Sequence, residues 1–277
     1  MQGRYNMKII TLIENTCERK GCIPEHGLSI YAETCKHRLL LDAGQTDALI
    51  NNAEVLNVDL TKVDTVVLSH GHYDHSGGII PFSYINPNAS VYIHRKASEP
   101  HYHDERYIGI DQHISGLSQT IFTDESTEID DELFLFSNIK GRRLYPQGNR
   151  KLSKIENGQR YEDDFAHEQC LVITQNDRRI LLSGCAHNGI LNILDRYYEI
   201  FGNTPYAVLS GFHMMKKDAD YTDEEKTVIT QTAAELSKMN TMFFSGHCTG
   251  LPAFNMMKEI MGDQLQSLST GKEINIL

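Results

Sequence analysis

The feature that most constrains this chain is a cluster of three histidines and one aspartate directly after an apolar run. The run Val66–Leu68 is typical of a buried β-strand, and the polar cluster follows within six positions as His70, His72, Asp74 and His75. A hydrophobic core has no need of such residues, whereas neutral imidazole and carboxylate are side chains that hold divalent transition metals. Because they crowd a strand end and the turn after it, they can converge on one or two ions. The cluster therefore predicts a metal site.

Charge and cysteine content exclude several classes of protein. The 277-residue chain has a formal net charge of −11, so it has no excess positive charge with which to bind nucleic acid, and we expect no such partner. Six cysteines are too few for a disulfide scaffold, and no stretch approaches a membrane span. The residues before Met7 lack the apolar region of a secretory signal, and we interpret them as a leader or alternative start outside the fold. We therefore expect a cytoplasmic protein with reduced thiols and no membrane partner.

Short β-type runs alternate with amphipathic segments along most of the chain. Apolar spacing predicts helices at 47–56, 188–201, 222–239 and 251–261, the third opened by a capping box of Thr222 and Glu225. Strands are predicted at 7–13, 27–33, 38–41, 65–68, 90–94, 169–174, 179–183, 206–210, 241–245 and 273–277. Two groups of strands, each followed by helices, predict two packed sheets with helices outside, in a single α/β domain spanning residues 7–277.

Residues from about 96 to 165 differ from the rest of the chain. They are polar, rich in His, Asp, Glu and Tyr, and weakly periodic. We interpret them as a long loop that passes over the site, either as a lid or as an idle insertion. The histidines within it, His101, His103 and His113, are predicted to be solvated.

Predicted strands repeatedly end in residues that bind metals. The residues at these ends are Asp42, the His70–His75 cluster, His94, Cys185 with His187, His213 and His247. Such placement is what a site on the rim of a sheet requires.

Several motifs together resemble the metallo-β-lactamase fold superfamily. The pattern His70-x-His72-x-Asp74-His75 is similar to its signature, and the run 40–44 is similar to its strand ending in Asp-x-Gly. His167 before the predicted hairpin and Gly246-His247 resemble its later histidine motifs. The runs 25–29, 183–190, 211–213 and 246–250 are similar to a subgroup of metal-dependent hydrolases, β-lactamase superfamily II, which includes a dihydropterin ribofuranosyl-aminobenzene phosphate synthase.

The resemblance implies a four-layer αββα sandwich with two divalent metal ions at one edge between the sheets. One ion would be held by His70, His72 and His167, and the other by Asp74, His75 and His247. The superfamily usually has a bridging carboxylate where this chain has Cys185. Either Cys185 is a thiolate ligand or His187 takes over coordination there. Thiolate would favour zinc, whereas a site of nitrogen and oxygen ligands would also suit iron or manganese.

Residues around the predicted ligands receive supporting roles. Asp42 is expected to orient a ligand imidazole through a hydrogen bond. His26 and His213 are candidates to line the substrate pocket, with ordinary surface histidines as the alternative.

The predicted function is a metal-dependent hydrolase that uses a metal-bound hydroxide on a small anionic substrate, an ester, thioester or phosphoester. Asp74 would be both ligand and catalytic residue. Three alternatives remain open at this point: a methanopterin-type synthase, a di-iron redox enzyme, and a non-catalytic metal-binding sensor.

Overall fold

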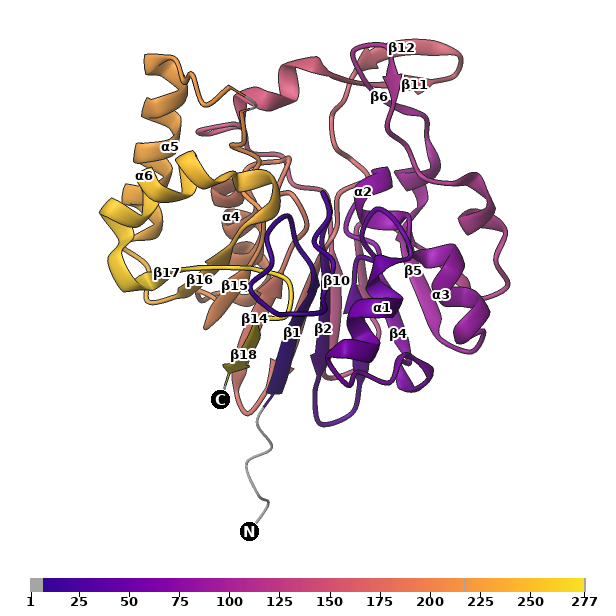
Figure 1. The fold of residues 1–277 in the computed structure, drawn as a ribbon. Helices are drawn as coiled ribbons and strands as arrows, with labels where there is room; N and C mark the ends of the chain where they lie inside the picture. The colour runs from indigo at the N-terminus through magenta and orange to yellow at the C-terminus, as the bar shows by residue number, and fades with distance from the viewer. Residues whose placement is uncertain (1–6, 217, 277) are drawn as a thin grey trace.

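Two mixed seven-stranded sheets face each other, and helices cover the outer face of each sheet (Figure 1). The computed structural model describes residues 7–216 and 218–276, so the predicted leader before Met7 lies outside the described residues. The arrangement confirms the predicted αββα sandwich.

The first sheet combines an antiparallel half with a parallel half. Strands β3, β4, β5 and β8 run parallel to one another, and the remaining strands are antiparallel to their neighbours. Its strand order is β18 (Glu273–Ile276), β1 (Met7–Ile13), β2 (Ser29–Glu33), β3 (Arg38–Leu41), β4 (Thr65–Val67), β5 (Ser90–His94) and β8 (Thr120–Thr123). Helices α1 (Ala48–Val55) and α3 (Ile79–Ile85) pack on its outer face.

The second sheet repeats this design. Strands β14 to β17 are parallel, and β13, β10 and β9 extend the sheet in antiparallel fashion. Its order is β17 (Leu265–Ser267), β16 (Met242–Ser245), β15 (Ala207–Leu209), β14 (Arg178–Leu182), β13 (Cys170–Gln175), β10 (Leu133–Phe136) and β9 (Ser126–Glu128). The covering helices are α4 (Ile190–Phe201), α5 (Asp223–Leu236) and α6 (Leu251–Met261).

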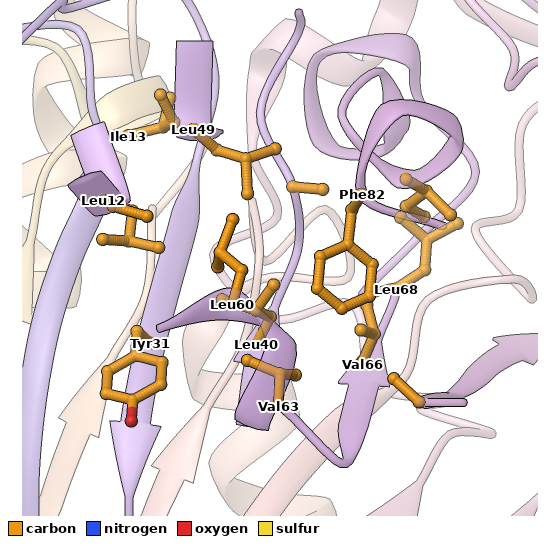
Figure 2. Packing of buried hydrophobic residues seen from close by; sticks show 14 of the residues in the cluster. Leu12, Ile13, Tyr31, Leu40, Leu49, Leu60, Val63, Val66, Leu68 and Phe82 are labelled. Carbon is orange, nitrogen blue, oxygen red and sulfur yellow. The ribbon is translucent and has the colours of Figure 1, made fainter. Parts of the chain in front are cut away.

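Strands that are buried on both faces explain why the apolar runs are continuous. In β3, Leu39 and Leu41 enter the core between the sheets, whereas Leu40 enters the core beneath the helices. There Leu40 shares a cluster with Leu49 of α1 and Phe82 of α3 (Figure 2). A strand with apolar residues on both faces fits only an inner layer, as observed.

The four predicted helices are confirmed, each with its ends within three residues of the prediction. The capping box is also confirmed, because Thr222 and Glu225 exchange side-chain to backbone hydrogen bonds. The predicted hairpin turns between β13 and β14 through Asn176 and Asp177, both with positive φ. None of the described helices combines the length and apolar character that crossing a membrane requires.

The prediction of a long loop over residues 96–165 is wrong for much of that segment. Strands β8, β9 and β10 complete the two main sheets. The others form a third sheet above α2 (Tyr73–Ser76), in the order β12 (Gln159–Glu162), β11 (Leu152–Glu156), β6 (His101–His103) and β7 (Arg106–Tyr107) (Figure 1). These strands have only two to five residues and pair with distant segments, so periodicity could not reveal them.

Short 3-10 helices connect several of these elements. In the described chain they are η1 (Leu60–Lys62), η2 (Arg95–Ser98), η3 (Gln112–Gly116), η4 (Gln147–Lys151), η5 (His247–Thr249) and η6 (Gly262–Gln264). Two of them matter for the site, since η4 passes beside it and η5 carries His247.

Candidate metal centre

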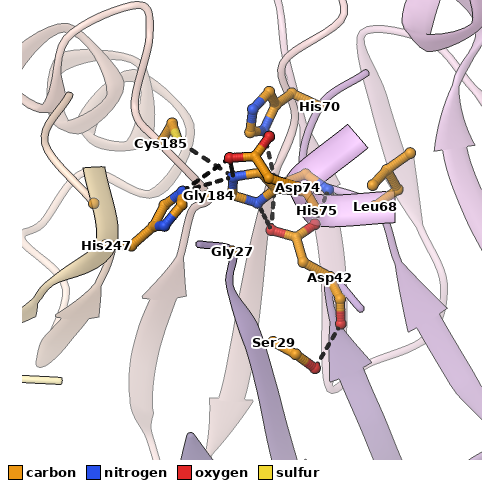
Figure 3. A network of polar contacts seen from close by, with 12 residues as sticks. Gly27, Ser29, Asp42, Leu68, His70, Asp74, His75, Gly184, Cys185 and His247 are labelled. Atoms are coloured by element: carbon orange, nitrogen blue, oxygen red, sulfur yellow. Dashed lines mark hydrogen bonds and ion pairs between the residues drawn. The ribbon is translucent and has the colours of Figure 1, made fainter. Parts of the chain in front are cut away.

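The candidate site lies where parallel strands of both sheets end. Asp42 follows β3, His70 lies shortly after β4, and Cys185, His213 and His247 come after β14, β15 and β16. Because parallel strands end at the same edge of a sheet, these residues gather at one rim, and the two rims face each other. Figure 3 shows His70, Asp74, His75, Cys185 and His247 pointing toward one another.

Four residues at this rim have a strained backbone. Asp42, Ala186, His213 and His247 have φ values of 61°, 53°, 51° and 49°, in the left-handed region that non-glycine residues rarely adopt. Such conformations persist only where the surrounding contacts hold them, and they cluster at functional sites. Here they turn the chain sharply at four strand ends and so bring side chains from separate strands together.

The first group of potential ligands consists of His70, Cys185 and His187, whose donor atoms lie within 4.8 Å of one another. His187 Nδ1 donates to Asn149 Oδ1 (3.1 Å), and Asn149 donates back to the His187 carbonyl (2.7 Å). His70 Nδ1 donates to Ser69 Oγ (2.8 Å), which in turn donates to Asp42 (2.7 Å). Both rings therefore keep a free electron pair on Nε2.

The Nε2 atoms of His70 and His187 are buried without a hydrogen-bond partner among the described residues. An unsatisfied buried polar atom costs about 1–3 kcal/mol. A metal ion would take up both electron pairs, so this donor set fits a metal.

The second group consists of His75, Cys185 and His247, again within 4.8 Å of one another. His75 Nε2 lies 3.1 Å from His247 Nε2 and 3.2 Å from Cys185 Sγ (Figure 3). His75 Nδ1 donates to Asp42 (2.7 Å) and His247 Nδ1 to Asn15 Oδ1 (2.9 Å). Two Nε2 electron pairs at this separation repel each other unless a proton or a cation lies between them. This group therefore fits a metal as well.

Cys185 belongs to both groups, in the position where a bridging ligand would lie. The sequence left two alternatives open, coordination by Cys185 or coordination by His187. The geometry is compatible with both at once, because Cys185 lies between the two groups and His187 belongs to the first group. Burial and the neighbouring Cys248 raise the pKa of the Cys185 thiol well above its ordinary value. A thiolate at this position therefore requires a nearby cation, and metal coordination deprotonates a thiol outright.

Asp74 lies beside the second group. Its Oδ2 is 3.4 Å from His247 Nε2, 3.7 Å from His75 Nε2 and 3.4 Å from His26 Nε2. Burial by itself would raise the pKa of Asp74, but His75, His247 and His26 outweigh it and hold that pKa well below its ordinary value. The carboxylate is therefore ionised at neutral pH and available to a metal or to a water molecule.

The sequence grouped His72 and His167 with His70 as ligands of one metal, and the two rings lie at different distances from His70: the centroids are 4.6 Å apart for His72 and 6.1 Å apart for His167. The His72 ring lies beside the first group, with centroids 4.6 Å from His70 and 4.8 Å from His187. His167 is in neither group. Its Nδ1 accepts a hydrogen bond from the Gly71 N–H (2.8 Å), so the neutral ring carries its proton on Nε2. The first group contains His187, and not His167, beside His70 and Cys185.

Among the remaining histidines, the prediction that His101 is solvated is wrong. His101 is fully buried and its Nδ1 lies 2.7 Å from Asp163 Oδ2. His103 and His113 have side chains that are 48% and 90% exposed, as predicted. His94 accepts from the Lys96 N–H and belongs to neither group.

Four residues in contact with the site were not identified from the sequence: Asn15, His101, Asn149 and Asp163. The asparagines had no recognisable signal, because each acts through a partner more than 30 positions away. For His101 the sequence offered a weak signal, the alternation His101-Tyr102-His103. In a strand this alternation places His101 and His103 on one face and Tyr102 on the other.

A cavity of about 830 Å³ opens next to the two groups. Its lining includes His26, His72, Asp74, Cys185, His187 and His213. The two histidines that the sequence offered for a substrate pocket, His26 and His213, therefore both lie at this cavity. Four cationic side chains also line it: Arg106, Arg150, Lys151 and Lys216. Arg150 pairs with Glu224 and Lys216 with Glu225. Within residues 7–216 and 218–276, Arg106 and Lys151 have no carboxylate partner, so they remain available to an anion.

Comparison with known proteins agrees with this geometry. A family model described as the metallo-β-lactamase superfamily matches residues 23–219. The chain is 29% identical to the 7,8-dihydropterin-6-methyl-4-(β-D-ribofuranosyl)-aminobenzene-5′-phosphate synthase of Methanocaldococcus jannaschii, covering 97% of this chain and 96% of that one. It also resembles the crystal structure of Tm1679, a metal-dependent hydrolase of the β-lactamase superfamily, with a TM-score of 0.82, 28% identity and 98% and 99% coverage. Zn²⁺-bound PqqB from Methylobacterium extorquens shares the fold (TM-score 0.57, 13% identity, 97% and 100% coverage).

Proposed function

Because this chain belongs to the metallo-β-lactamase superfamily, we propose that it is a metal-dependent hydrolase acting on a small anionic substrate through two divalent ions. The observation that carries the proposal is the pair of histidine groups that share Cys185: His70 Nε2 and His187 Nε2 have no partner among the described residues, and His75 Nε2 and His247 Nε2 face each other at 3.1 Å. The first ion would be held by His70, His72 and His187, and the second by Asp74, His75 and His247, with Cys185 between them. The thiolate favours zinc.

When bound, such ions lower the pKa of coordinated water and polarise the bond under attack. The chain's own residues supply orientation and proton transfer. Asp42, Asn15 and Asn149 each hold a ring through Nδ1 so that Nε2 faces the site. Asp74 is ionised and lines the cavity, so it is placed to take the proton of an attacking water molecule. His26, 3.4 Å from Asp74 and partly exposed, connects that carboxylate to the cavity.

The anionic character of the substrate is supported by Arg106 and Lys151. Arg106 belongs to β7 and lies over the Tyr73 ring at 4.9 Å, at the cavity wall. Lys151 ends η4 on the same side of the fold. Neither charge is neutralised by a carboxylate within the described residues, so an anionic group of a substrate is the complement that the cavity lacks.

Removing Arg106 should therefore weaken substrate binding more than turnover. We expect Arg106→Gln to raise KM by about 10–150-fold while kcat changes little, because a lost charge-assisted hydrogen bond is worth about 1.5–3 kcal/mol. Steady-state kinetics at constant ionic strength measures this. Arg95→Gln serves as control, since Arg95 pairs with the exposed Asp124 and does not line the cavity. Equal KM values for Arg106→Gln and the parent protein would remove the support for an anionic substrate.

Metal removal tests the proposal as a whole. Protein purified without chelator should contain close to two divalent ions per chain, with zinc expected and iron or manganese as alternatives. It should cleave at least one member of a panel of phosphodiesters, phosphomonoesters, thioesters and lactones. A chelator should abolish that activity, and added Zn²⁺ should restore it. Metal-free protein with undiminished activity would refute the proposal.

A second candidate function is synthesis rather than hydrolysis. It is favoured by the 29% identity over 97% of the chain to the aminobenzene-phosphate synthase. The same panel separates the two candidates. A synthase would form the dihydropterin ribofuranosyl-aminobenzene phosphate of that relative's name, detectable by mass spectrometry, and would leave the simple esters intact.

A further inference from the structure

Two buried glutamates hold the backbone of two proposed metal ligands. Glu168 Oε1 accepts a hydrogen bond from the His187 N–H (2.6 Å), and Glu14 Oε1 accepts one from the His247 N–H (2.6 Å). The exposed fractions of Glu168 and Glu14 are 1% and 3%. Neither glutamate is among the described residues that line the cavity, so neither is placed to contact a substrate there. What the two glutamates contact is the backbone of the two histidines.

An asparagine contacts two further polar atoms of each of these histidines. Asn149 Oδ1 lies 3.1 Å from His187 Nδ1, and Asn149 Nδ2 donates to the His187 carbonyl (2.7 Å). Asn15 Oδ1 lies 2.9 Å from His247 Nδ1, and Asn15 Nδ2 donates to the His247 carbonyl (3.3 Å). The N–H, the carbonyl and the ring Nδ1 of each histidine thus have a partner, which leaves Nε2 as the atom that faces the site.

The second oxygen of each glutamate fixes another part of the chain. Glu168 Oε2 accepts from the Asn188 N–H (2.9 Å) and from Asn188 Nδ2 (2.8 Å), directly after His187. Glu14 Oε2 accepts from the Thr16 N–H (2.6 Å). Loops are generally the more mobile parts of a fold, and both histidines lie outside the regular strands and α-helices. The buried carboxylates therefore fix two loops that carry ligands.

The hydrogen-bond partners of these carboxylates carry no positive charge. In the described part of the chain, the groups that donate to the oxygens of Glu168 and Glu14 are backbone N–H groups, the Asn188 amide and the Thr16 hydroxyl. A buried carboxylate without a cationic partner is costly. A metal ion bound by the adjacent histidine would supply a positive charge near each carboxylate.

We propose that Glu168 and Glu14 are positioning residues, one for each ion. Glu168 holds His187 in place for the first ion, and Glu14 holds His247 in place for the second. The proposal rests on the two-metal site proposed above. Because the two glutamates act on different ligands, the binding of each ion can be weakened separately. Loss of groups that orient a metal ligand typically costs about 10–100-fold in metal affinity.

Substitutions that keep the size of the side chain test this division. Glu168→Gln and Glu14→Gln each replace one acceptor oxygen by an NH₂ group, which cannot accept, and remove the charge. Competition with a chelator measures the two Zn²⁺ affinities, and zinc anomalous diffraction from crystals grown at limiting Zn²⁺ measures the occupancy of each position. We expect Glu168→Gln to weaken the first position by about 10–100-fold and to leave the second nearly unchanged, and Glu14→Gln to do the reverse.

Glu132 offers a matched control. It is also a buried glutamate, and it accepts from Thr34 Oγ1 (2.6 Å) and from the Lys36 N–H (3.3 Å). Thr34 follows β2, which runs antiparallel to β3, so Glu132 lies at the rim opposite to the site. Glu132→Gln should bind both ions as the parent protein does.

Parent-like Zn²⁺ affinities in both folded variants would overturn the proposal, and so would loss of the same ion in both. Equal weakening by Glu132→Gln would overturn it as well, because that result indicates a general effect of removing a buried charge. A parent protein that binds no metal would instead refute the proposed function, and the positioning roles with it.

A measurement on the unsubstituted protein keeps the test independent of how the variants fold. Amide hydrogen exchange is followed by NMR in the zinc-loaded protein and again after the zinc is removed. We expect the His187 and His247 amides to exchange slowly in both states, because buried carboxylates hold them. Protection that disappears with the zinc would indicate that the ions order these loops, and would overturn the proposal.

Discussion

Replacing Cys185 with Ala should remove one ligand from each of the two proposed metal positions and lower turnover by at least about 100-fold. Cys185 is the residue that the two histidine groups share, so its loss affects both at once. Loss of residues that only support a ligand already costs 10–100-fold in metal affinity or activity, and loss of a ligand should cost more. Metal content by mass spectrometry and turnover at saturating substrate measure the effect.

Two further variants make this test specific. Cys185→Asp supplies a carboxylate, another anionic donor, and should recover much of the metal content that Cys185→Ala loses. Cys170→Ala removes a fully buried thiol of β13 that lies in the core and outside both groups, so it controls for the loss of buried sulfur. If Cys185→Ala kept two ions and normal turnover, Cys185 would be a packing residue and the shared-ligand interpretation would be wrong.

Replacing Asp42 with Ala should lower the free energy of unfolding of the metal-free protein by roughly 3–5 kcal/mol, the range observed when one partner of a buried ion pair is removed. Asp42 is fully buried and accepts from the Ser69 N–H, from Ser69 Oγ and from His75 Nδ1, each at 2.7 Å. All three donors would lose their partner. Alanine also tolerates the φ of 61° less well than aspartate does. Urea denaturation followed by circular dichroism measures the change.

Asp42→Asn tests how much of this effect comes from charge. Asparagine keeps the shape and tolerates the left-handed backbone, but its amide nitrogen cannot accept from Ser69 or His75. We expect an intermediate loss. The control Asp59→Ala removes an exposed carboxylate that caps η1 through the Thr61 N–H, which should cost about 1 kcal/mol. A loss for Asp42→Ala no greater than that of Asp59→Ala would contradict the central role assigned to this carboxylate.

Much of the fold could be predicted because its signals are local. The run 66–68, the capping box at Thr222 and the turn at 176–177 are each encoded within a few neighbouring residues. The same holds for the cluster His70 to Asp74 and His75, whose spacing at a strand end predicts metal binding in any surroundings that gather the side chains. The third sheet escaped prediction since its strands are too short to show a period.

The candidate ligand set could be predicted only in part. His167 precedes the predicted hairpin and His187 lies within the run 183–190, and their spacing in the sequence does not decide which of them binds metal. The structure distinguishes His167 from His187 by which ring nitrogen carries the proton. His167 Nδ1 accepts from Gly71, 96 positions away, whereas His187 Nδ1 donates to Asn149, 38 positions away. His101 was misassigned for a similar reason, since its burial depends on Asp163, 62 positions along the chain.

The order of residues was thus enough to establish a metal-binding αββα protein and the first cluster of ligand candidates. Hydrogen bonds between distant segments established which nitrogen of each ring is free, and the packing of the two sheets placed Cys185 between two histidine groups. The physical reason is that a strand or helix is determined by its own side chains, whereas the tautomer of a histidine is determined by whichever group the fold brings to its other nitrogen.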